Sequence, residues 1–553
     1  MPIINIPFPD PFPVPPIPRL PLPEPFPRPF PRPFPKPFPL PWFGECTPKI
    51  LVVTDNLNYQ QMDDFGLTEF VDTLRASTIH SMTPIVMTAQ FNPHAMATLS
   101  YDAATRHISN YKFTDATYGV LKSRYDVVFI LSISGEFGQQ LTDELGALEA
   151  ITAFMQAGGG VFATGDHEDL GAGMCKYIPR VRNMRHWTNT APQVVPSAGG
   201  TDRLTTNLPG RGDIVYSNDE YEFSDQSDQF PQRLYVNFRT EAGGIGLAHP
   251  LLQVPASNRA IEVFPDHPHE GECVIPNDLT TKLADNTTDE WPPLATGSRV
   301  SPEMVALTMS HGNAFPGKAA VTPRSFIAIC AYDGHRTSVV DSAGITSWLG
   351  RVVTDSTWHH FVNINIKPGL SALAGRNLQD IKQYYANLAT WLMPKNTRFC
   401  RRFPWIITEL LSYPLFEEIS PIPREQLDGP RLHSIGALVE RALLNHYTHA
   451  DVNALIDDAL EEAIGIDAKL KIEELGREFG AISARDVGFA AIGSLTMAIA
   501  ERFNELKDKS ELNGEEAFAD VGKNAVTEGV KLYLYHSRKS LGKMGQLIDS
   551  ISC

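Results

Sequence analysis

The sequence predicts an α/β protein: a parallel sheet sandwiched by helices, with a proline-rich N-terminal arm and a C-terminal α-helical domain. Three observations predict this arrangement. Short, continuous apolar runs alternate with helical patterns through the middle of the chain, which is typical of parallel strands buried on both faces. Proline dominates the first 44 residues, and the last third of the 553-residue chain carries amphipathic helical patterns in which no strand stands out.

Residues 1–45 are expected to form an extended arm. Nineteen of the 44 prolines precede residue 45, and every second residue from Pro21 to Pro41 is proline. Proline fixes φ and lacks a backbone N–H, so this stretch predicts polyproline II with a reach of roughly 65 Å at ~3.1 Å per residue. Its length and its phenylalanines predict docking on a neighbouring subunit, and therefore a homo-oligomer. A disordered tail is the alternative.

Residues 46–397 are predicted to form the α/β domain. The expected strands are apolar runs bounded by polar residues or glycine, at 49–55, 84–89, 125–134, 160–165, 260–265, 325–334 and 350–357. The expected helices cover 63–77 and 141–159, and the second is expected to have a capping threonine at Thr142 and to stop at glycine. Strands that alternate with helices in this way indicate a parallel sheet.

Residues 398–553 are predicted to form a helical domain used for packing or assembly. Residues 450–464 place apolar side chains at helical spacing. The weakly polar stretch 487–500 is too short to span a bilayer and predicts a buried helix.

Composition excludes several classes of protein. The net charge of −17 argues against a nucleic-acid binder and against an anionic membrane surface as partner. The six cysteines are scattered without a CxxC pair, which indicates neither a disulfide framework nor a thiolate zinc site. We therefore expect a reducing, cytoplasmic location and a small-molecule substrate, and no nucleotide cofactor is indicated.

Polar groups, most of which can titrate or coordinate, follow five of the predicted strands. They are Asp55 with Asn56; Asp166, His167 and Glu168; Asp266, His267, His269 and Glu270; Asp333, His335 and Arg336; and Trp358, His359 and His360. Because ligands bind beyond the carboxyl ends of parallel strands, five such ends predict one functional pocket. The expected acid–base groups are Asp166, His167, Glu168, His359 and His360.

The densest of these clusters is "PDHPHEGEC", residues 265–273. Imidazole and carboxylate groups are ligands of zinc, iron and manganese, so the segment predicts a divalent transition metal as cofactor. The expected metal ligands are Asp266, His267, His269 and Glu270. Their spacing is not a standard zinc signature, which leaves metal-free acid–base chemistry and a salt-bridged structural loop as alternatives.

The stretch "GAGMCKYIPRVRNMRHW", residues 171–187, is rich in cations. Arg180, Arg182, Arg185 and His186 could receive an anionic substrate, or they could simply offset neighbouring acids. Cys175 in the same stretch is a candidate nucleophile without a marked histidine partner in the sequence.

Two stretches carry a resemblance to a known family: 125–171, from "YDVVFILSIS" to "GVFATGDHEDLG", and 350–361, "GRVVTDSTWHHF". Over roughly residues 48–395 the chain resembles the class I glutamine amidotransferase-like superfamily, in the trehalose-utilisation-type branch without glutaminase activity. The resemblance implies a flavodoxin-like sheet. The family's nucleophilic cysteine lies at the elbow after the strand, where this chain has Gly165 followed by Asp166. The comparison therefore predicts that this chain does not hydrolyse glutamine.

The leading functional hypothesis is a hydrolase-type enzyme that acts on a small polar substrate through a His/carboxylate site. The principal alternative is a non-catalytic structural protein that retains the fold and assembles through the arm and the helical domain. A sugar-binding module without chemistry is a third reading.

Overall fold

A computed structural model gives the structure of the chain. It describes residues 47–59, 65–79, 82–166, 169–187, 232–240, 246–257, 259–265, 271–294, 297–310, 324–340, 346–367, 375–395, 422, 426–445, 447–465, 472, 483–506 and 515–551. The predicted arm and the predicted domain boundary at residue 398 lie outside these residues, so both stay predictions.

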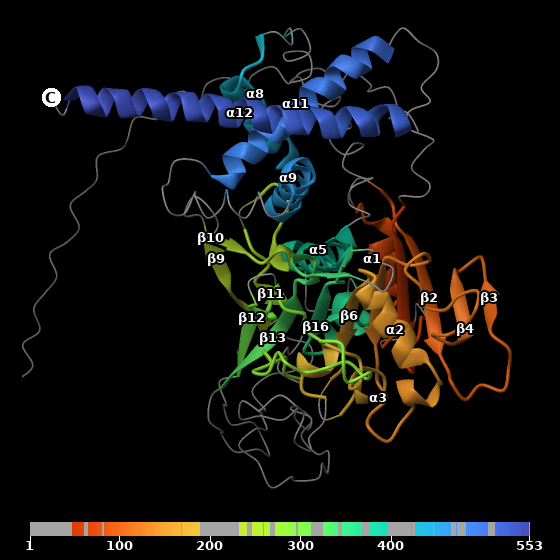
Figure 1. Cartoon of the computed structure of the whole chain (residues 1–553). Coiled ribbons are helices and arrows are strands. Elements are labelled where there is room, and N and C mark those ends of the chain that lie inside the picture. The colour runs from red at the N-terminus through yellow and green to blue at the C-terminus, as the bar shows by residue number, and fades with distance from the viewer. Residues whose placement is uncertain are drawn as a thin grey trace, which may run out of the picture. The chain divides into compact units, whose positions relative to one another are not determined.

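One ten-stranded sheet forms the centre of the α/β part (Figure 1). In spatial order its strands are β3 (Ser100–Asp102), β4 (His107–Tyr111), β2 (Ile85–Phe91), β1 (Lys49–Thr54), β5 (Val127–Leu131), β6 (Gly160–Thr164), β16 (Val352–Asp355), β13 (Arg324–Tyr332), β12 (Glu303–Ser310) and β8 (Tyr235–Val236). All strands from β4 to β16 in this order run parallel. The α/β class predicted from the sequence is confirmed.

The edges of the sheet differ from the prediction. Strands β13, β12 and β8 pair antiparallel beyond β16, and β3 pairs antiparallel with β4 at the other edge. The strand expected at 260–265 is only β11 (Val263–Phe264), which pairs outside the main sheet with β7 (Gln232–Arg233). Further short pairs join β9 (Phe238–Thr240) to β10 (Gly246–Ala248) and β14 (Ser338–Val340) to β15 (Thr346–Trp348).

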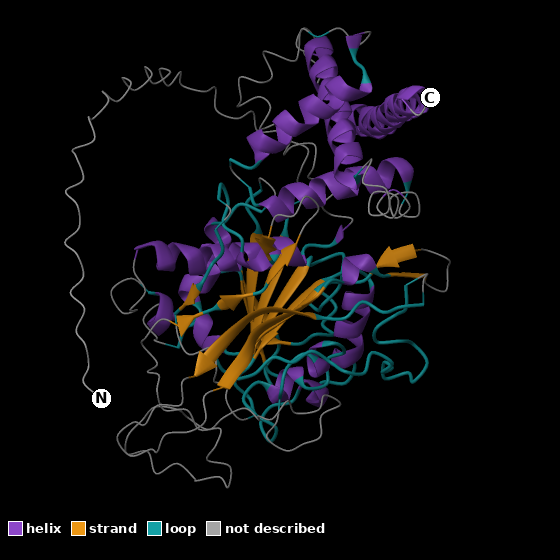
Figure 2. Ribbon diagram, turned by 90° about the vertical axis from the view of Figure 1, so that its left-hand side faces the viewer, coloured by secondary structure: helices purple, strands orange, loops and turns teal. Residues whose placement is uncertain are grey.

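Helices cover both faces of the sheet, and Figure 2 shows the strands as a layer between them. Helices α1 (Thr68–Ala76) and α5 (Gly375–Leu392) pack on one face, whereas α2 (Ala147–Gln156) and α3 (Ala172–Cys175) pack on the other. Along β1, Ile50 and Val52 face the first pair of helices, and Leu51 and Val53 face the second. Because both faces are buried, the strand is apolar at every one of these positions rather than at alternate ones.

The predicted helix over 141–159 begins later than expected. Residues Leu141–Asp143 form a short 3-10 helix, η2, in which Gln140 and Asp143 form a capping box. The chain then passes through Gly146, whose φ of 85° is left-handed, and α2 starts at the next residue. Thr142 is therefore not the N-cap of the long helix, because glycine at 146 gives the chain a new direction between the two helices.

The helical part contains α8 (Gly429–Leu443), α9 (His449–Ile464), α11 (Ala484–Leu506) and α12 (Glu515–Ile551). The helices predicted over 450–464 and 487–500 are present as α9 and α11. Side chains of all four form a hydrophobic cluster of their own. Among the described residues, no helix is both long enough and apolar enough to cross a membrane.

Two glycines bring the backbones of α8 and α11 into direct contact. A Cβ atom at Gly436 would lie 1.9 Å from the carbonyl oxygen of Phe489, and one at Gly493 would lie 1.9 Å from that of Leu432. Real Cβ atoms do not approach a carbonyl oxygen so closely, so any larger residue must push the helices apart.

We predict that Gly493→Ala destabilises the helical part by about 1–3 kcal/mol, although alanine is the better helix former, because overpacking outweighs propensity. Gly542→Ala on α12 is the matched control, since a Cβ there meets nothing within 4 Å; it should stabilise by about 0.5–1 kcal/mol. Urea unfolding followed by circular dichroism measures both. Equal stabilisation by the two substitutions would contradict the contact.

Candidate functional site

The carboxyl ends of four neighbouring parallel strands form one row. Residues Thr54, Leu131, Thr164 and Asp355, which end β1, β5, β6 and β16, are register partners across the sheet. The loops that follow these residues therefore emerge at the same edge. The sequence-based expectation that Asp55, Asp166 and the 358–360 segment gather at one edge is met by this register.

Asp55 is held by the loop after β5. Its carboxylate accepts hydrogen bonds from the hydroxyl of Ser132 (2.6 Å) and from the amides of Ile133 and Ser134 (2.9 Å each), as well as from the amide of Asn56 (2.7 Å). The side chain is 3% exposed. With this many donors around it, the carboxylate ties the ends of β1 and β5 together and has a structural role.

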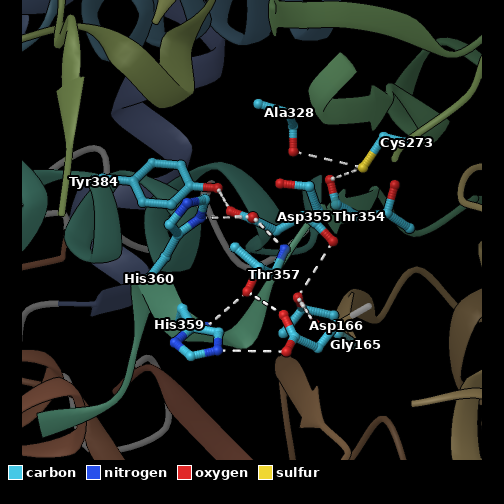
Figure 3. A network of polar contacts seen from close by, with 12 residues as sticks. Gly165, Asp166, Cys273, Ala328, Thr354, Asp355, Thr357, His359, His360 and Tyr384 are labelled. Atoms are coloured by element: carbon cyan, nitrogen blue, oxygen red, sulfur yellow. Dashed lines mark hydrogen bonds and ion pairs between the residues drawn. The ribbon is translucent and has the colours of Figure 1, made fainter. Parts of the chain in front are cut away.

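Asp166 lies at the sharp elbow after β6, where its amide donates to the carbonyl of Leu170 at 2.9 Å. Its buried carboxylate accepts a hydrogen bond from the hydroxyl of Thr357 at 2.5 Å, and its second oxygen lies 3.4 Å from Nε2 of His359 (Figure 3). Thr357 in turn accepts from the amide of His359 at 3.0 Å. One hydroxyl therefore positions both the carboxylate and the backbone of the histidine.

Asp355 and His360 form a second pair (Figure 3). Nδ1 of His360 lies 2.7 Å from one carboxylate oxygen of Asp355, and the hydroxyl of Tyr384 donates to the other at 2.7 Å. All three side chains are completely buried. Burial, reinforced by the charge of Asp355, raises the pKa of Tyr384 well above its usual value, so the phenol stays protonated and remains a donor.

Several buried polar atoms near these pairs have no hydrogen-bond partner among the residues that the structure describes. They are Nε2 of His360, Oγ of Ser356 and Nε1 of Trp358. Buried polar atoms in folded proteins are nearly always hydrogen-bonded to protein or water. A group of such atoms at the carboxyl edge of a sheet is typical of a site that takes a polar ligand.

Arg185 joins the two loops that carry the pairs. Its guanidinium donates to the carbonyl of Asp166 at 2.5 Å and to that of Ser356 at 2.9 Å, and it stacks over Trp187 at 4.7 Å. In the sequence, Arg185 is one of four cations that could receive an anionic substrate or offset neighbouring acids. In the structure its guanidinium donates to these two backbone carbonyls, and these contacts are structural.

His359 is the more accessible of the two histidines, with 11% of its side chain exposed. Its ring stacks on Trp358 at 4.3 Å and meets the edge of Phe65, a residue that is 45% exposed. A separate cavity of about 610 Å³ lies beside α1 and α5, and none of the residues of the two His–Asp pairs lines it.

The structure brings together three of the five expected acid–base residues: Asp166, His359 and His360. His167 and Glu168 lie outside the described residues. So do all four expected metal ligands, Asp266, His267, His269 and Glu270. Within the described part of the chain, no group of three or more His, Cys, Asp or Glu side chains is arranged to hold a metal ion.

Two expectations are wrong. His335 does not share this edge, because β13 runs antiparallel to β16 and its last residue, Tyr332, pairs with Val352 at the start of β16. Cys175 is not a suitable nucleophile, because it is fully buried and burial raises the pKa of its thiol. A neutral, inaccessible thiol does not attack a substrate.

Sequence reasoning missed Asp355 and Tyr384. Asp355 closes the apolar run "VVTD" five residues before His360, so a carboxylate at the end of a buried strand was the available signal. Tyr384 lies on α5, and nothing in its sequence surroundings distinguishes it from the other apolar-face residues of that helix.

We predict that Tyr384→Phe lowers the free energy of unfolding by about 1–3 kcal/mol, because it leaves a buried carboxylate oxygen of Asp355 without its donor. Tyr535→Phe is the control: Tyr535 is 61% exposed, and its change should stay within about 0.5 kcal/mol. Urea denaturation of both variants gives the comparison, and indistinguishable stabilities would exclude the Tyr384–Asp355 hydrogen bond.

Comparison of the chain with protein-family models, with curated proteins and with solved structures gives no match. The function is therefore inferred from the chemistry of the two His–Asp pairs and their surroundings.

Proposed function

We propose that the protein is a hydrolase-type enzyme that acts on a small polar substrate at the carboxyl edge of the parallel strands. The observation that carries the proposal is the Asp355–His360 pair. A carboxylate that accepts a hydrogen bond from Nδ1 favours the tautomer in which Nδ1 carries the hydrogen. The lone pair of the neutral imidazole then lies on Nε2. None of the described residues hydrogen-bonds to Nε2 of His360, and we take it as the atom available for chemistry.

The chemistry that suits this arrangement is general base catalysis. Nε2 of His360 takes a proton from an attacking water, and Asp355 stabilises the imidazolium that forms. Tyr384 holds the second oxygen of Asp355 and keeps the carboxylate oriented. Such a base is effective only when a third group fixes its orientation, and here Asp355 and Tyr384 do so.

The Asp166–His359 pair would supply the complementary acid at the more exposed side of the site. His167 and Glu168 directly follow Asp166 in the elbow, and we retain them as proposed acid–base groups. This assignment rests on their position in the sequence.

A divalent transition metal, zinc, iron or manganese, fits the same residues. Histidines that bind metals generally donate their other ring N–H to a carboxylate, as His360 does to Asp355. The ring of Phe264, two residues before Asp266, lies 4.6 Å from that of His360. Gly271, just after Glu270, is so close to the carbonyl of Ser356 that a Cβ would lie 2.2 Å from it.

Both flanks of the 266–270 segment therefore contact this site. As an alternative to the general-base role, we propose that His360 joins Asp266, His267, His269 and Glu270 in holding the metal. Its Nε2 would then be a metal ligand rather than a base, because Nδ1 is hydrogen-bonded to Asp355. When bound, the metal would supply a Lewis acid and lower the pKa of a coordinated water.

We also propose that the α/β part belongs to the amidotransferase-like superfamily with a flavodoxin-like sheet. Counting β1, β2, β5, β6 and β16 in chain order, their order across the sheet is 2-1-3-4-5, as in flavodoxin-like folds, and β4 is additional. Asp166 lies at the elbow after β6 where that superfamily's catalytic cysteine would stand, which supports a chemistry other than glutamine hydrolysis.

A non-catalytic structural protein is the second candidate, and one observation favours it. Asp166, Asp355 and His360 are all completely buried, as structural networks usually are. In that case the arm at residues 1–45 and the helical part would assemble a homo-oligomer. The cytoplasmic location and the small-molecule partner remain predictions from composition.

We predict that His360→Gln abolishes hydrolysis, measured on a panel of small chromogenic esters, amides, phosphates and glycosides. Loss of the general base should lower kcat by about 100-fold or more while KM changes little. His94→Gln is the matched control, because the side chain of His94 is 68% exposed and pairs with Asp143 rather than with either of the two His–Asp pairs. Its activity should equal that of the unmodified protein.

The thermal midpoint of each variant distinguishes the two candidate functions. Large destabilisation by His360→Gln, together with no hydrolysis of any substrate by the unmodified protein, would favour the structural candidate. His167→Ala extends the test to the elbow, where we expect loss of activity with a nearly unchanged melting temperature.

We predict that protein purified without chelators contains about one equivalent of zinc, iron or manganese, and that His267→Ala/His269→Ala loses it. Elemental analysis by mass spectrometry measures the content. If the unmodified protein held less than about a tenth of an equivalent and took up none on reconstitution, the metal proposal would be withdrawn, leaving the metal-free acid–base mechanism.

A further inference from the structure

Arg180 is a buried cation whose guanidinium has no hydrogen-bonded counter-ion among the described residues. It is 0% exposed, and within the described part of the chain its Nε, Nη1 and Nη2 atoms have no hydrogen-bond partner. An arginine side chain stays charged in proteins and carries five N–H donors. A charge in this position is strongly destabilising unless something pairs with it.

The neighbouring carboxylate of Glu290 already accepts hydrogen bonds from other groups. Its oxygens accept hydrogen bonds from Nη2 of Arg182 at 2.6 Å, from Nδ2 of Asn183 at 3.1 Å and from the backbone amide of Arg180. Glu290 therefore holds the backbone of Arg180 but not its guanidinium.

The guanidinium lies over the ring of Tyr332, with Cζ 5.7 Å from the ring centroid. This cation–π contact uses none of the five N–H donors. Among the described residues, the buried hydroxyls of Tyr332 and Thr337 have no hydrogen-bond partner of good geometry. Thr337 lies five residues beyond Tyr332, directly after the short 3-10 turn Gly334–Arg336. Burial raises the pKa of Tyr332, and the charge of Arg180 and the hydroxyl of Thr337 offset part of that rise.

The backbone of Arg180 is also strained. Its φ of 67° and ψ of −54° are unusual for a residue with a Cβ atom. Such strain persists only where the surroundings enforce it, and it concentrates at sites that bind ligands. Here it directs a guanidinium into the interior beside two hydroxyls.

We propose that a small oxyanion, with the chemistry of phosphate or of a carboxylate, binds to the guanidinium of Arg180 and the hydroxyls of Tyr332 and Thr337. The planar guanidinium matches two oxygens of one anion, and each hydroxyl donates to a further lone pair. No carboxylate is hydrogen-bonded to any of these three groups among the described residues. A cation is therefore a poor fit to the site.

This site is separate from the proposed hydrolytic site. Tyr332 pairs with Val352 at the amino end of β16, whereas Asp355 ends that strand at the opposite edge of the sheet. The inference does not rest on the proposed hydrolysis, and a protein without catalytic activity would still bind the anion.

Anion binding is tested on the full-length protein by thermal unfolding in sodium phosphate, sodium acetate and sodium chloride at equal ionic strength. We expect phosphate or acetate, but not chloride, to raise the melting temperature with saturation. Phosphate alone would identify a tetrahedral oxyanion, and acetate alone would identify a carboxylate. Ion chromatography of the supernatant after denaturation detects an anion that is already bound at purification.

Arg180→Met should weaken the apparent affinity for the anion at least tenfold, and in anion-free buffer it should not be less stable, because it removes an unpaired buried charge. Arg336→Met is the matched control: this arginine is exposed, adjoins Thr337 and should leave the affinity unchanged. Tyr332→Phe and Thr337→Val keep the charge and should each weaken binding, which tests the site even if Arg180→Met does not fold.

Two results would overturn the proposal. One is a melting temperature that responds to phosphate and acetate no more than to chloride, with no anion released on denaturation. The other is an anion effect that survives unchanged in Tyr332→Phe and Thr337→Val.

Discussion

The parallel pairing of β6 with β16 is the constraint on which the rest of the α/β part depends. The strands lie side by side although Thr164 and Asp355 are 191 residues apart in the chain. Their register sets the elbow after β6 beside the 355–360 segment, so Asp166 meets Thr357 and His359 there. The Asp355–His360 pair lies within that segment. Arg185 and Thr357 reinforce the same junction by binding backbone and side chains on both sides of it.

The part of the fold that depends on local patterns could be predicted from the sequence. The buried strands β1, β2, β5, β6 and β16 are continuous apolar runs, and α9 and α11 carry helical spacing. Strand direction could not be predicted in the same way, because a run such as that of β13 is equally apolar whichever way it runs. The assumption that every strand is parallel therefore placed His335 at the wrong edge.

The candidate site shows the same division. His359 and His360 could be found because they follow a strand, as could Asp166. The Tyr384–Asp355 contact could not be predicted. Tyr384 lies on a helix 29 residues further along the chain, and only the packing of α5 on the sheet brings it to Asp355. Thr142 is a related case. Threonine is a common N-cap residue, but the left-handed backbone at Gly146 determines where α2 begins.

The hydrogen bonds around Asp55 have a consequence for the rigidity of the sheet. The chain turns in opposite directions from β1 and β5, towards β2 on one side and β6 on the other. A buried carboxylate that accepts hydrogen bonds from the loop after β5 ties these diverging ends together. Separating them would leave the carboxylate and several amides without partners, so local opening is costly at this point of the fold.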